Sequence, residues 1–389
     1  MKSSTHRILT THAGSLPRPQ SLIQLLTARF SGSLVEDAVM EKASEAASRA
    51  SIASQIEAGL DVINNGEQGR ESFFTYVQHR MTGFGGTTTR PIMADILKYP
   101  GALERRRQAM GTSERVDLLK APKAIGEINY ITPEPIEAEC RQLRQLLDEK
   151  GGEYTEAFIS APSPGIIAAA MQNEHYDNLE AYVNALADAL RTEYTTITNA
   201  GFLLQIDAPD LALERHTLFQ DKPLAEFLEF VRIVVSATNR ALTGIPKEQV
   251  RLHVCWGNYE GPHDLDVSLE DIWSDVSQMN VGAIMLSMAN PRHAHEYRLF
   301  TEPGFLGDKL LISGVIETTT NYIEHPEVVA DRIERIARAV GDAHRIIAGT
   351  DCGFETAAGS KMVVPEVVWA KLKSLSEGAA IVSKRLFGK

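Results

Sequence analysis

Cysteine is scarce in this sequence, with three residues among 389. Three cysteines cannot form the disulfide framework that stabilises small secreted domains, so a reducing compartment, the cytoplasm, is expected. No stretch approaches the roughly 20 apolar residues that a helix needs to cross a bilayer, and the first residues lack the apolar core of a signal peptide. We therefore expect no membrane partner.

Positive charge is also in short supply, because 39 lysines and arginines face 51 acidic residues and leave a formal net charge of −12. No basic run offers a stripe of phosphate contacts, and the three arginines at 105–107 lie in a mixed-charge segment typical of a solvated face. This balance argues against a nucleic-acid partner. The composition that remains, 43% hydrophobic and 23% charged residues, is typical of a globular protein with a large core.

Strand-like and helical patterns alternate along most of the chain. Strand-like runs begin at Arg7 and Leu60 and are then expected at 154–161, 202–207, 250–255, 283–288, 310–316 and 345–349. Helical periodicity covers 36–58, 178–199, 224–242, 269–279, 326–340 and 365–387. Strands that alternate with helices pair in parallel through right-handed crossovers. We predict the α/β class, with residues 1–389 as a single (β/α)8 TIM barrel and residues 83–131 as an insertion after the second strand.

Nearly every predicted strand ends in polar residues, which supports the barrel further. In barrel enzymes the active site lies at the carboxyl ends of the strands, where all eight loops meet. An open, doubly wound sheet is the alternative architecture. Such a sheet binds its ligand at one switch point. This architecture would therefore not explain why polar residues lie at the ends of all eight strands.

Three of these polar residues have the chemistry of a zinc site. His253 and Cys255 are two positions apart at the end of one predicted strand, so their side chains project from the same face. Cys352 follows another apolar run. A lone histidine or cysteine on a strand is usually a core residue, but two thiolates with one imidazole select zinc over magnesium or calcium. We predict that His253, Cys255 and Cys352 bind one Zn2+.

Three protein ligands leave one coordination position for a substrate, which is the catalytic rather than the structural arrangement. Two thiolates also cancel the charge of zinc, so a substrate thiol bound there would ionise and keep an electron-rich sulfur. The predicted enzyme activates a small-molecule thiol as a metal-bound thiolate and alkylates it to a thioether with an alkyl donor. A zinc-stabilised binding protein is the non-catalytic alternative, although structural sites usually take four ligands placed near one another in sequence.

Seven short motifs resemble the cobalamin-independent methionine synthase superfamily, in the single-barrel branch that includes zinc-dependent epoxyalkane:coenzyme M transferases. They are THAGSLPRP (11–19), NGEQG (65–69), LQID (204–207), HVCWGN (253–258), ANPRH (289–293), TTTN (318–321) and GTDCGF (349–354). The resemblance covers most of the chain. It implies the three zinc ligands named above, and it implies that Glu67 and Asp207 line the pocket for the thiol substrate. Without the resemblance, Asp207 would be a helix cap and Glu67 a solvated loop carboxylate.

The resemblance also implies an alternative function, methyl transfer from a methylated folate to homocysteine. One position departs from that pattern. The synthase supplies a further zinc-binding glutamate near the end of the sixth strand, where this chain has Ser287. Because a serine hydroxyl is a poor zinc ligand, water or another group would complete the coordination, and the departure argues against methionine synthesis as the specific activity. A metal-free barrel decarboxylase similar to uroporphyrinogen decarboxylase is a third class, which the zinc-type ligands disfavour.

The second substrate needs groups of its own. Protonation of the leaving group of the donor requires a general acid, for which His12, Tyr259, His263 and Tyr322 are the candidates. Each of them could equally be a structural hydrogen-bonding group.

Arg18 and Arg70 are candidates to bind an anionic tail of a substrate through paired hydrogen bonds, although surface arginines are common. Trp256 is interpreted as a stacking wall for the substrate or as a core residue. The sequence leaves open which thiol and which donor react, and whether the chain forms a homo-oligomer.

Overall fold

Eight parallel strands form one continuous sheet in this computed structural model, which describes residues 1–110 and 115–388 and omits the side chains of residues 109 and 110. The strands are β1 (Leu9–Thr10), β2 (Val62–Ile63), β5 (Glu156–Pro162), β6 (Leu203–Asp207), β7 (Val250–Val254), β8 (Ala283–Leu286), β9 (Leu310–Ile316) and β10 (Ile346–Thr350). Their order across the sheet is β1-β10-β9-β8-β7-β6-β5-β2, and every neighbouring pair is parallel.

The two outer strands of that order, β1 and β2, lie side by side and nearly close the sheet. The Asp61 N–H donates to the Thr10 carbonyl (3.1 Å), and the Thr11 hydroxyl donates to the Val62 carbonyl (2.9 Å). Across the interior, the buried guanidinium of Arg251 in β7 donates to the Thr11 hydroxyl (2.9 Å). The sheet is therefore a nearly closed barrel, and the predicted (β/α)8 TIM barrel is confirmed.

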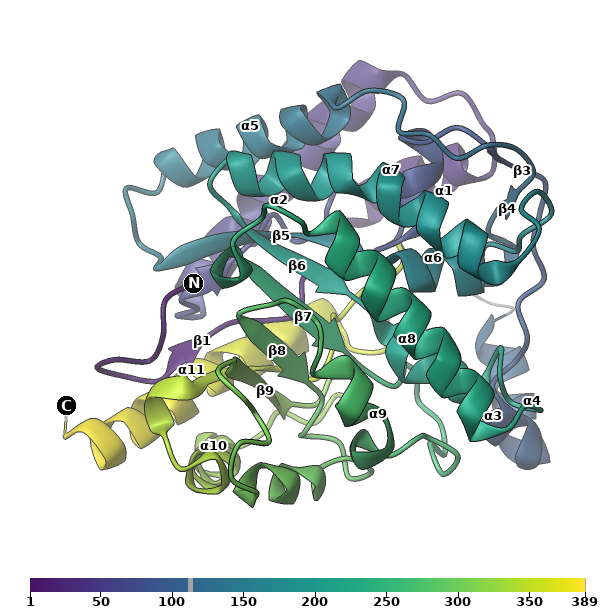
Figure 1. Cartoon of the computed structure of the whole chain (residues 1–389). Coiled ribbons are helices and arrows are strands. Elements are labelled where there is room, and N and C mark those ends of the chain that lie inside the picture. Colours follow the sequence, from purple (N-terminus) through teal and green to yellow (C-terminus); the bar gives the residue numbers. More distant parts are fainter. Residues whose placement is uncertain (111–114, 389) are drawn as a thin grey trace.

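Helices cover the outside of the barrel (Figure 1). They are α1 (Gln20–Phe30), α2 (Asp37–Glu57), α5 (Glu134–Asp148), α6 (Pro164–Ala170), α7 (Leu179–Asn199), α8 (Leu224–Ala241), α9 (Leu269–Val276), α10 (Pro326–Val340) and α11 (Pro365–Phe387). Local sequence sets several of their ends. Ser163, Asn178 and Ser268 each accept a hydrogen bond from a backbone N–H in the first turn of α6, α7 and α9. Gly341 ends α10 in the left-handed conformation, with φ of 77°.

The predicted elements agree well with the observed ones. The strand at 310–316 and the helices at 326–340 and 365–387 coincide with β9, α10 and α11, and the other strands and helices differ only at their ends. The helix expected at 269–279, for example, ends at Val276. The helical pattern at 137–143 lies within α5, whereas α1 and α6 have no counterpart among the predicted helices. All seven residues of α6 are buried, so no polar face marks its helical period.

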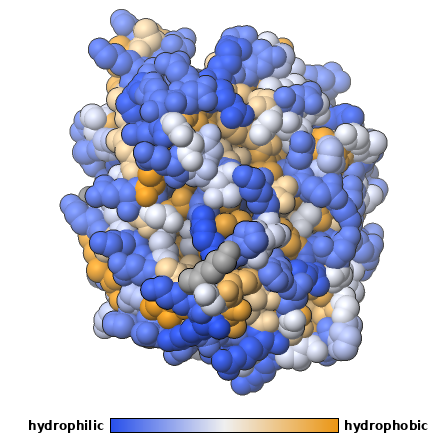
Figure 2. All heavy atoms as spheres, turned by 90° about the vertical axis from the view of Figure 1, so that its left-hand side faces the viewer, coloured by the Kyte–Doolittle hydropathy of each residue, from blue (hydrophilic) through white to orange (hydrophobic). Residues whose placement is uncertain are grey.

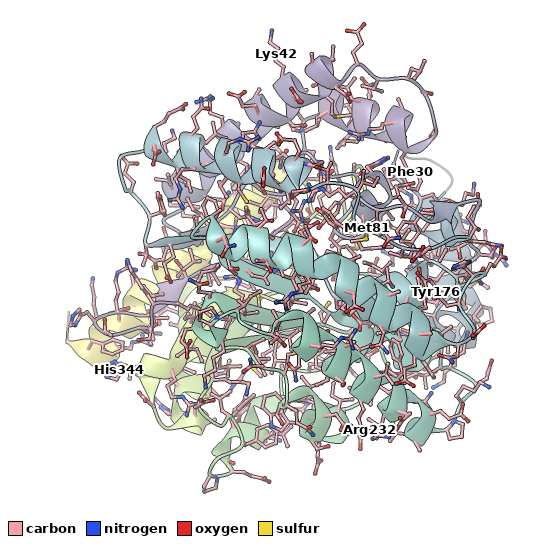
Figure 3. All side chains as sticks on the ribbon, turned by 45° about the horizontal axis from the view of Figure 1, so that its top comes forward. Phe30, Lys42, Met81, Tyr176, Arg232 and His344 are labelled. Atoms are coloured by element: carbon pink, nitrogen blue, oxygen red, sulfur yellow. The ribbon has the colours of Figure 1, made fainter. Side chains whose placement is uncertain are left out.

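Apolar side chains fill the space between the strands and the outer helices. With all side chains drawn, Met81 lies within the protein, whereas Lys42 and Arg232 point outward (Figure 3). The face where the two chain ends lie is mostly hydrophilic, with hydrophobic residues scattered over it (Figure 2). In the part of the chain that the structure describes, no helix combines the length and the apolarity needed to cross a bilayer.

The segment 83–131, predicted to be an insertion, lies in the chain between β2 and β5. Its elements are β3 (Phe84–Gly85), α3 (Ala94–Lys98), α4 (Pro100–Met110) and β4 (Lys123–Ala124), and β3 pairs with β4 in antiparallel fashion. Residues 111–114 lie outside the described residues. The division of the chain into a single domain with this insertion remains a prediction.

Candidate active site

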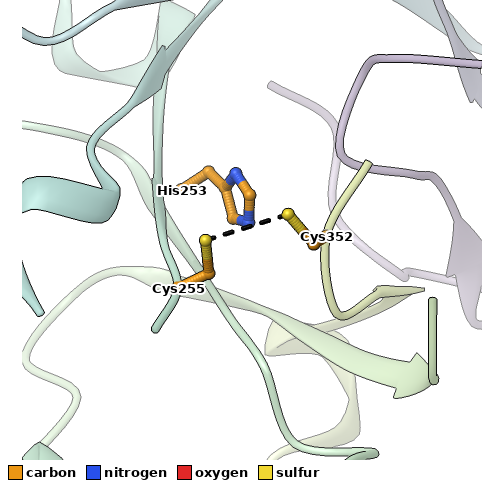
Figure 4. Close-up of side chains that lie close together, drawn as sticks. All are labelled: His253, Cys255 and Cys352. Carbon is orange, nitrogen blue, oxygen red and sulfur yellow. Dashed lines mark hydrogen bonds between the residues drawn. The ribbon is translucent and has the colours of Figure 1, made fainter. Parts of the chain in front are cut away.

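Two strand ends far apart in the sequence bring three ligand-type side chains together. His253 is in β7, Cys255 follows that strand, and Cys352 follows β10, which β8 and β9 separate from β7 in the sheet. One ligand atom from each side chain lies within 4.8 Å of the others, and the two sulfur atoms are 3.8 Å apart (Figure 4). We call these buried residues the thiol cluster. Their geometry could hold a metal ion, and zinc binding remains a prediction.

The neighbouring strand fixes the ring of His253. Asp207 at the end of β6 is its register partner, and the Asp207 carboxylate lies 3.0 Å from Nδ1 of the imidazole. The Gln205 amide donates to the same carboxylate oxygen (2.7 Å), which holds that oxygen in place. A carboxylate on Nδ1 fixes the tautomer and leaves Nε2 as the nitrogen for a metal, the arrangement typical of metal-ligating histidines. Asp207, predicted to line the thiol pocket, thus contacts the thiol cluster itself.

The charges of the thiol cluster are unequal. The Cys352 thiol, which donates to the Cys255 sulfur, holds the pKa of Cys255 well below its usual range, and the His253 imidazole acts in the same direction. The Cys255 sulfur in turn raises the pKa of Cys352. Burial lowers the pKa of His253, but Cys255 and Asp207 outweigh it and raise the value to about 10. Protein groups alone therefore ionise one thiol and keep the other protonated, and a dication would allow both to ionise.

The donor set itself fits zinc. Two sulfur atoms and one imidazole nitrogen are the soft and borderline ligands that zinc prefers over hard oxygen-seeking cations. Among the described residues, the group of metal-ligand side chains has these three members. Ser287, which the family resemblance places where the synthase is expected to have a glutamate, is buried, and its hydroxyl donates to the backbone carbonyl of Asp351 (2.7 Å). Its hydrogen bond stabilises the backbone beside Cys352.

The Asp351 carboxylate fixes the loop after β8 beside the cluster. It accepts hydrogen bonds from the backbone N–H groups of Met288 (2.9 Å), Ala289 (2.8 Å) and Asn290 (2.8 Å) and from the Asn290 side chain (3.0 Å). Burial raises the pKa of Asp351 to about 6. These four bonds join the end of β8 to the residue that precedes Cys352, and so restrict the position of that cysteine.

A cavity of about 660 Å3 adjoins the thiol cluster, and both sulfur-bearing residues line it. The segment 83–131 supplies the cationic part of the lining, which is Arg90, Arg105, Arg106 and Arg115. Arg90 pairs with Glu214, and the Arg106 guanidinium lies 5.8 Å from the ring centroid of Tyr259. The interpretation of residues 105–107 as a solvated face therefore holds for Arg107 but not for Arg106, because α4 turns the latter toward the cavity.

Glu67 is buried beside Asp207 and has one oxygen without a partner. Its Oε1 accepts from the Ser160 hydroxyl (2.7 Å), whereas Oε2 has no hydrogen bond among the described residues. Burial and the nearby Asp207 carboxylate raise the pKa of Glu67 to about 7. Gly14 allows this position, because a Cβ there would lie 2.4 Å from Oε1 of Glu67. The assignment of Glu67 to substrate binding remains a prediction.

Other protein groups bind the two arginines predicted to hold an anionic tail. The Arg18 guanidinium donates to the carbonyls of Glu355 (2.7 Å) and Glu67 (2.9 Å). The Arg70 guanidinium pairs with Glu139 (2.9 Å) and donates to the Ser160 carbonyl (2.7 Å). Neither arginine lines the described cavity. These contacts are structural and give no support to the predicted anion binding.

His12 and Trp256 are likewise engaged within the protein. The ring of His12 bonds to Gln55 through Nε2 (2.8 Å) and accepts from the Gly14 N–H through Nδ1 (3.2 Å), and burial lowers its pKa to about 3. Trp256 donates to the Val267 carbonyl (2.6 Å) and is 2% exposed. A neutral, enclosed His12 is a poor source of protons, and Trp256 belongs to the packing rather than to the cavity wall.

Tyr322, a further predicted acid, is 84% exposed and does not line the described cavity. Tyr259 and His263, the remaining two, belong to a network built around Asp266. Three imidazoles surround that carboxylate, from His216 (3.2 Å), His263 (2.9 Å) and His293 (2.8 Å). We call these four residues the imidazole cluster. Tyr259 lines the cavity, and its hydroxyl lies 3.2 Å from Nε2 of His216. His216 and Asp266 were not among the residues predicted from the sequence.

Comparison with known proteins gives the family. Residues 8–370 match the sequence model for the catalytic domain of cobalamin-independent synthases. A methionine synthase of Saccharolobus solfataricus is 26% identical over 385 residues, which cover 97% of this chain and 95% of the relative. A methionine synthase of Thermococcus kodakarensis is 26% identical over 380 residues, which cover 97% and 94% of the two chains.

Solved structures show the same architecture. A B12-independent methionine synthase from Shewanella sp. W3-18-1, in complex with selenomethionine, superimposes with a TM-score of 0.73 at 22% identity and covers 98% of this chain and 100% of that one. This likeness concerns the fold, and it agrees with the barrel described above. Because the family match extends over most of the sequence, the chain belongs to the cobalamin-independent synthase catalytic-domain family.

Proposed function

We propose that the chain is a zinc-dependent transferase that alkylates a small thiol to a thioether. The observation that carries this proposal is the position of two cysteine sulfurs, 3.8 Å apart, in the wall of a cavity that is large enough for a small-molecule substrate. His253, Cys255 and Cys352 would hold the zinc ion. The chemistry that zinc would supply there is the ionisation of an entering thiol near neutral pH.

Homocysteine with a methyl donor is the first substrate pair to test, because the relatives that match nearly the whole chain are methionine synthases. In that reaction the thiol loses its proton, its sulfur takes the methyl group, and the leaving group of the donor takes a proton. The environment of Glu67 favours a thiol substrate that carries an amino group. A buried carboxylate with a free oxygen is a suitable partner for an ammonium group. An epoxide is the alternative donor, which Ser287 favours because this position departs from the synthase pattern.

The protein's own groups have separate roles in this proposal. Asp207 orients the imidazole of His253, and the bonds of Asp351 to the loop after β8 position Cys352. Glu67 and Asp207 bind the thiol substrate on the side of the barrel near β2 and β6. The arginines of the segment 83–131 lie where an anionic part of the donor would enter the cavity.

Metal analysis and thioether detection test the proposal together. The purified protein should contain about one zinc per chain, its zinc X-ray absorption spectrum should gain a sulfur neighbour when homocysteine is added, and mass spectrometry should detect a new thioether with a methylated folate, an epoxide or iodomethane. Cys255→Ser and Cys352→Ser should lose both zinc and product. Cys140→Ser is the matched control, because Cys140 is buried in α5 outside the thiol cluster. A fully active Cys352→Ser variant would contradict the proposal.

A further inference from the structure

The loops around the cavity contain more ionisable groups than the thiol cluster requires. The Asp266 side chain is 1% exposed, yet three imidazoles contact it. Burying a carboxylate and several imidazoles is expensive, and apolar residues of the same size usually hold a loop equally well. His263 also adopts a left-handed backbone conformation, with φ of 54°, which is unfavourable for a residue other than glycine. Such groups and such backbone conformations are concentrated at functional sites.

The network has one end at the cavity and the other near the solvent. At the cavity end, the Tyr259 hydroxyl donates to the Asp95 carboxylate (2.6 Å) and lies 3.2 Å from Nε2 of His216. His216 presents Nδ1 to Asp266 at 3.2 Å. At the solvent end, Asp266 contacts Nδ1 of His263, whose side chain is 18% exposed. Polar contacts therefore lead without interruption from a cavity-lining hydroxyl to a partly exposed imidazole.

We propose that Tyr259, His216 and Asp266 form a proton relay that serves the transfer reaction. Tyr259 is the proton donor to the leaving group, His216 returns a proton to Tyr259, and Asp266 is a positioning residue that orients the His216 ring. This inference rests on the proposed function and adds the source of the proton to it. The arrangement has the order carboxylate, imidazole, hydroxyl that is familiar from other proton-transfer sites.

The steps of this relay balance. After the thiolate has taken the alkyl group, the Tyr259 hydroxyl turns from the Asp95 carboxylate to the departing anion. The tyrosine O–H bond breaks as a bond from hydrogen to the leaving atom forms. Nε2 of His216 then gives a proton to the tyrosinate. A proton from solvent then restores Nε2 of His216, while Asp266 stays ionised and orients the ring from the Nδ1 side. The proton that the thiol released at the start equals the proton consumed at the end, so no oxidant, reductant or further reactant is needed.

The charges around the relay are compatible with this direction. Besides Asp266, the groups that face His216 are Asp95, His263 and Glu214. Burial lowers the pKa of His216, whereas the carboxylates of Asp266, Asp95 and Glu214 act in the opposite direction and favour the protonated form that the relay needs. Burial and Asp95 raise the pKa of Tyr259, whereas Arg106 over its ring opposes that shift and would stabilise the tyrosinate. The 3.2 Å hydrogen bond of His216 to Tyr259 has the length usual for catalytic hydrogen bonds before substrate binds, whereas the 3.2 Å contact to Asp266 is an ion-pair distance without hydrogen-bond geometry.

Two alkyl donors with different leaving groups test the relay. Iodide departs without a proton, whereas the nitrogen of a methylated folate or the oxygen of epoxypropane must gain one. With homocysteine as the thiol, Tyr259→Phe and His216→Asn should keep the wild-type rate with iodomethane. With a proton-requiring donor, both variants should lose about 10²- to 10⁴-fold in kcat, the usual contribution of general acid catalysis. A purely structural role would lower both rates alike.

Tyr182→Phe is the matched control, because that buried hydroxyl donates to the Met171 carbonyl outside the network. It should leave both donor reactions unchanged. Equal losses with both donors in the Tyr259 and His216 variants would overturn the relay, as would a wild type that uses iodomethane but neither proton-requiring donor. A wild-type protein that fails to alkylate homocysteine with any of the donors tested would instead contradict the proposed function. Thermal unfolding of each variant shows whether it is folded.

Discussion

The two cysteines of the thiol cluster line the cavity, whereas the imidazole cluster lies behind Tyr259 in the cavity wall, and the two clusters are built differently. The thiol cluster comes from the ends of β7 and β10, where the register of the sheet fixes each residue. The imidazole cluster comes from the loops after β6, β7 and β8, and ion pairs among its own members hold it together. The thiol cluster has too little positive charge to ionise both of its thiols. In the imidazole cluster, the carboxylate and the imidazoles pair with one another. The two clusters should therefore respond differently to mutation, the first in ligand binding and the second in folding stability.

The largest stability effect is expected at the centre of the imidazole cluster. Burial lowers the pKa of His293, but Asp266 and Glu296 outweigh it and raise the value to about 9, so Asp266→Asn leaves a buried cation with a weaker partner. We expect a loss of about 3 kcal/mol in the free energy of unfolding, measured with urea at neutral pH. Asp331→Asn, on the exposed face of α10, is the control. A loss no greater than that of Cys255→Ser would remove the contrast between the clusters.

Glu67 should make stability depend on pH. Its pKa is raised from 4.5 to about 7 in the folded chain, so folding favours the protonated form. The stabilisation is complete below pH 4.5, decreases as the pH rises, and is lost above about pH 7, with a total of about 3 kcal/mol at most. Urea unfolding between pH 5 and 8 should show this decrease in the wild type and a flatter curve in Glu67→Gln. Identical curves for the two proteins would contradict the assigned environment.

Asp207→Asn tests the orientation of the thiol cluster rather than its stability. The amide still fills the space, but it no longer places a negative charge on Nδ1 of His253. We expect zinc affinity to fall by about 10- to 100-fold, measured by competition with a chromophoric chelator. Asp221→Asn on an exposed loop should leave the affinity unchanged. An unchanged affinity in the Asp207 variant would mean that His253 needs no carboxylate partner.

The smallest effect is expected at Ser287. Ser287→Ala removes one hydrogen bond to the Asp351 carbonyl, which typically contributes about 1 kcal/mol. Zinc content should remain at the wild-type level, because the hydroxyl is not a ligand in our proposal. Elemental analysis of the Ser287→Ala and Cys255→Ser variants side by side measures this difference in zinc content. Zinc loss in the alanine variant equal to that of Cys255→Ser would make Ser287 part of the metal site.

Sequence reasoning succeeded where periodicity fixes position. Because parallel strands present their carboxyl ends at one edge of the barrel, the strands ending at His253 and near Cys352 could be placed together before any coordinates were known. Family membership followed from the same strand-end motifs. The side chains that meet in the thiol cluster are thus largely a consequence of strand order and of a two-residue spacing.

The loops were not predictable in the same way. His216 and Asp266 follow no alternating pattern, and their meeting depends on loop conformations that the local sequence does not set. The arginines at 105–107 have the composition of a solvated helix, and only the packing of α4 shows that Arg106 faces the cavity. Arg18 and Arg70 show the converse point, because their guanidinium groups lie near predicted strand ends yet bind backbone carbonyls and a carboxylate, which the sequence pattern does not indicate.

The separation of the two cysteines has a mechanical consequence. Cys255 and Cys352 are 97 positions apart, and three whole strands, β8, β9 and β10, lie between them in the chain. An ion held by both would act as a removable cross-link that closes a long loop of the chain, and such closure restricts the unfolded chain far more than the folded one. Binding of the ion would then make the part of the barrel from β7 to β10 more rigid as a unit, and removal of the ion would make it less rigid.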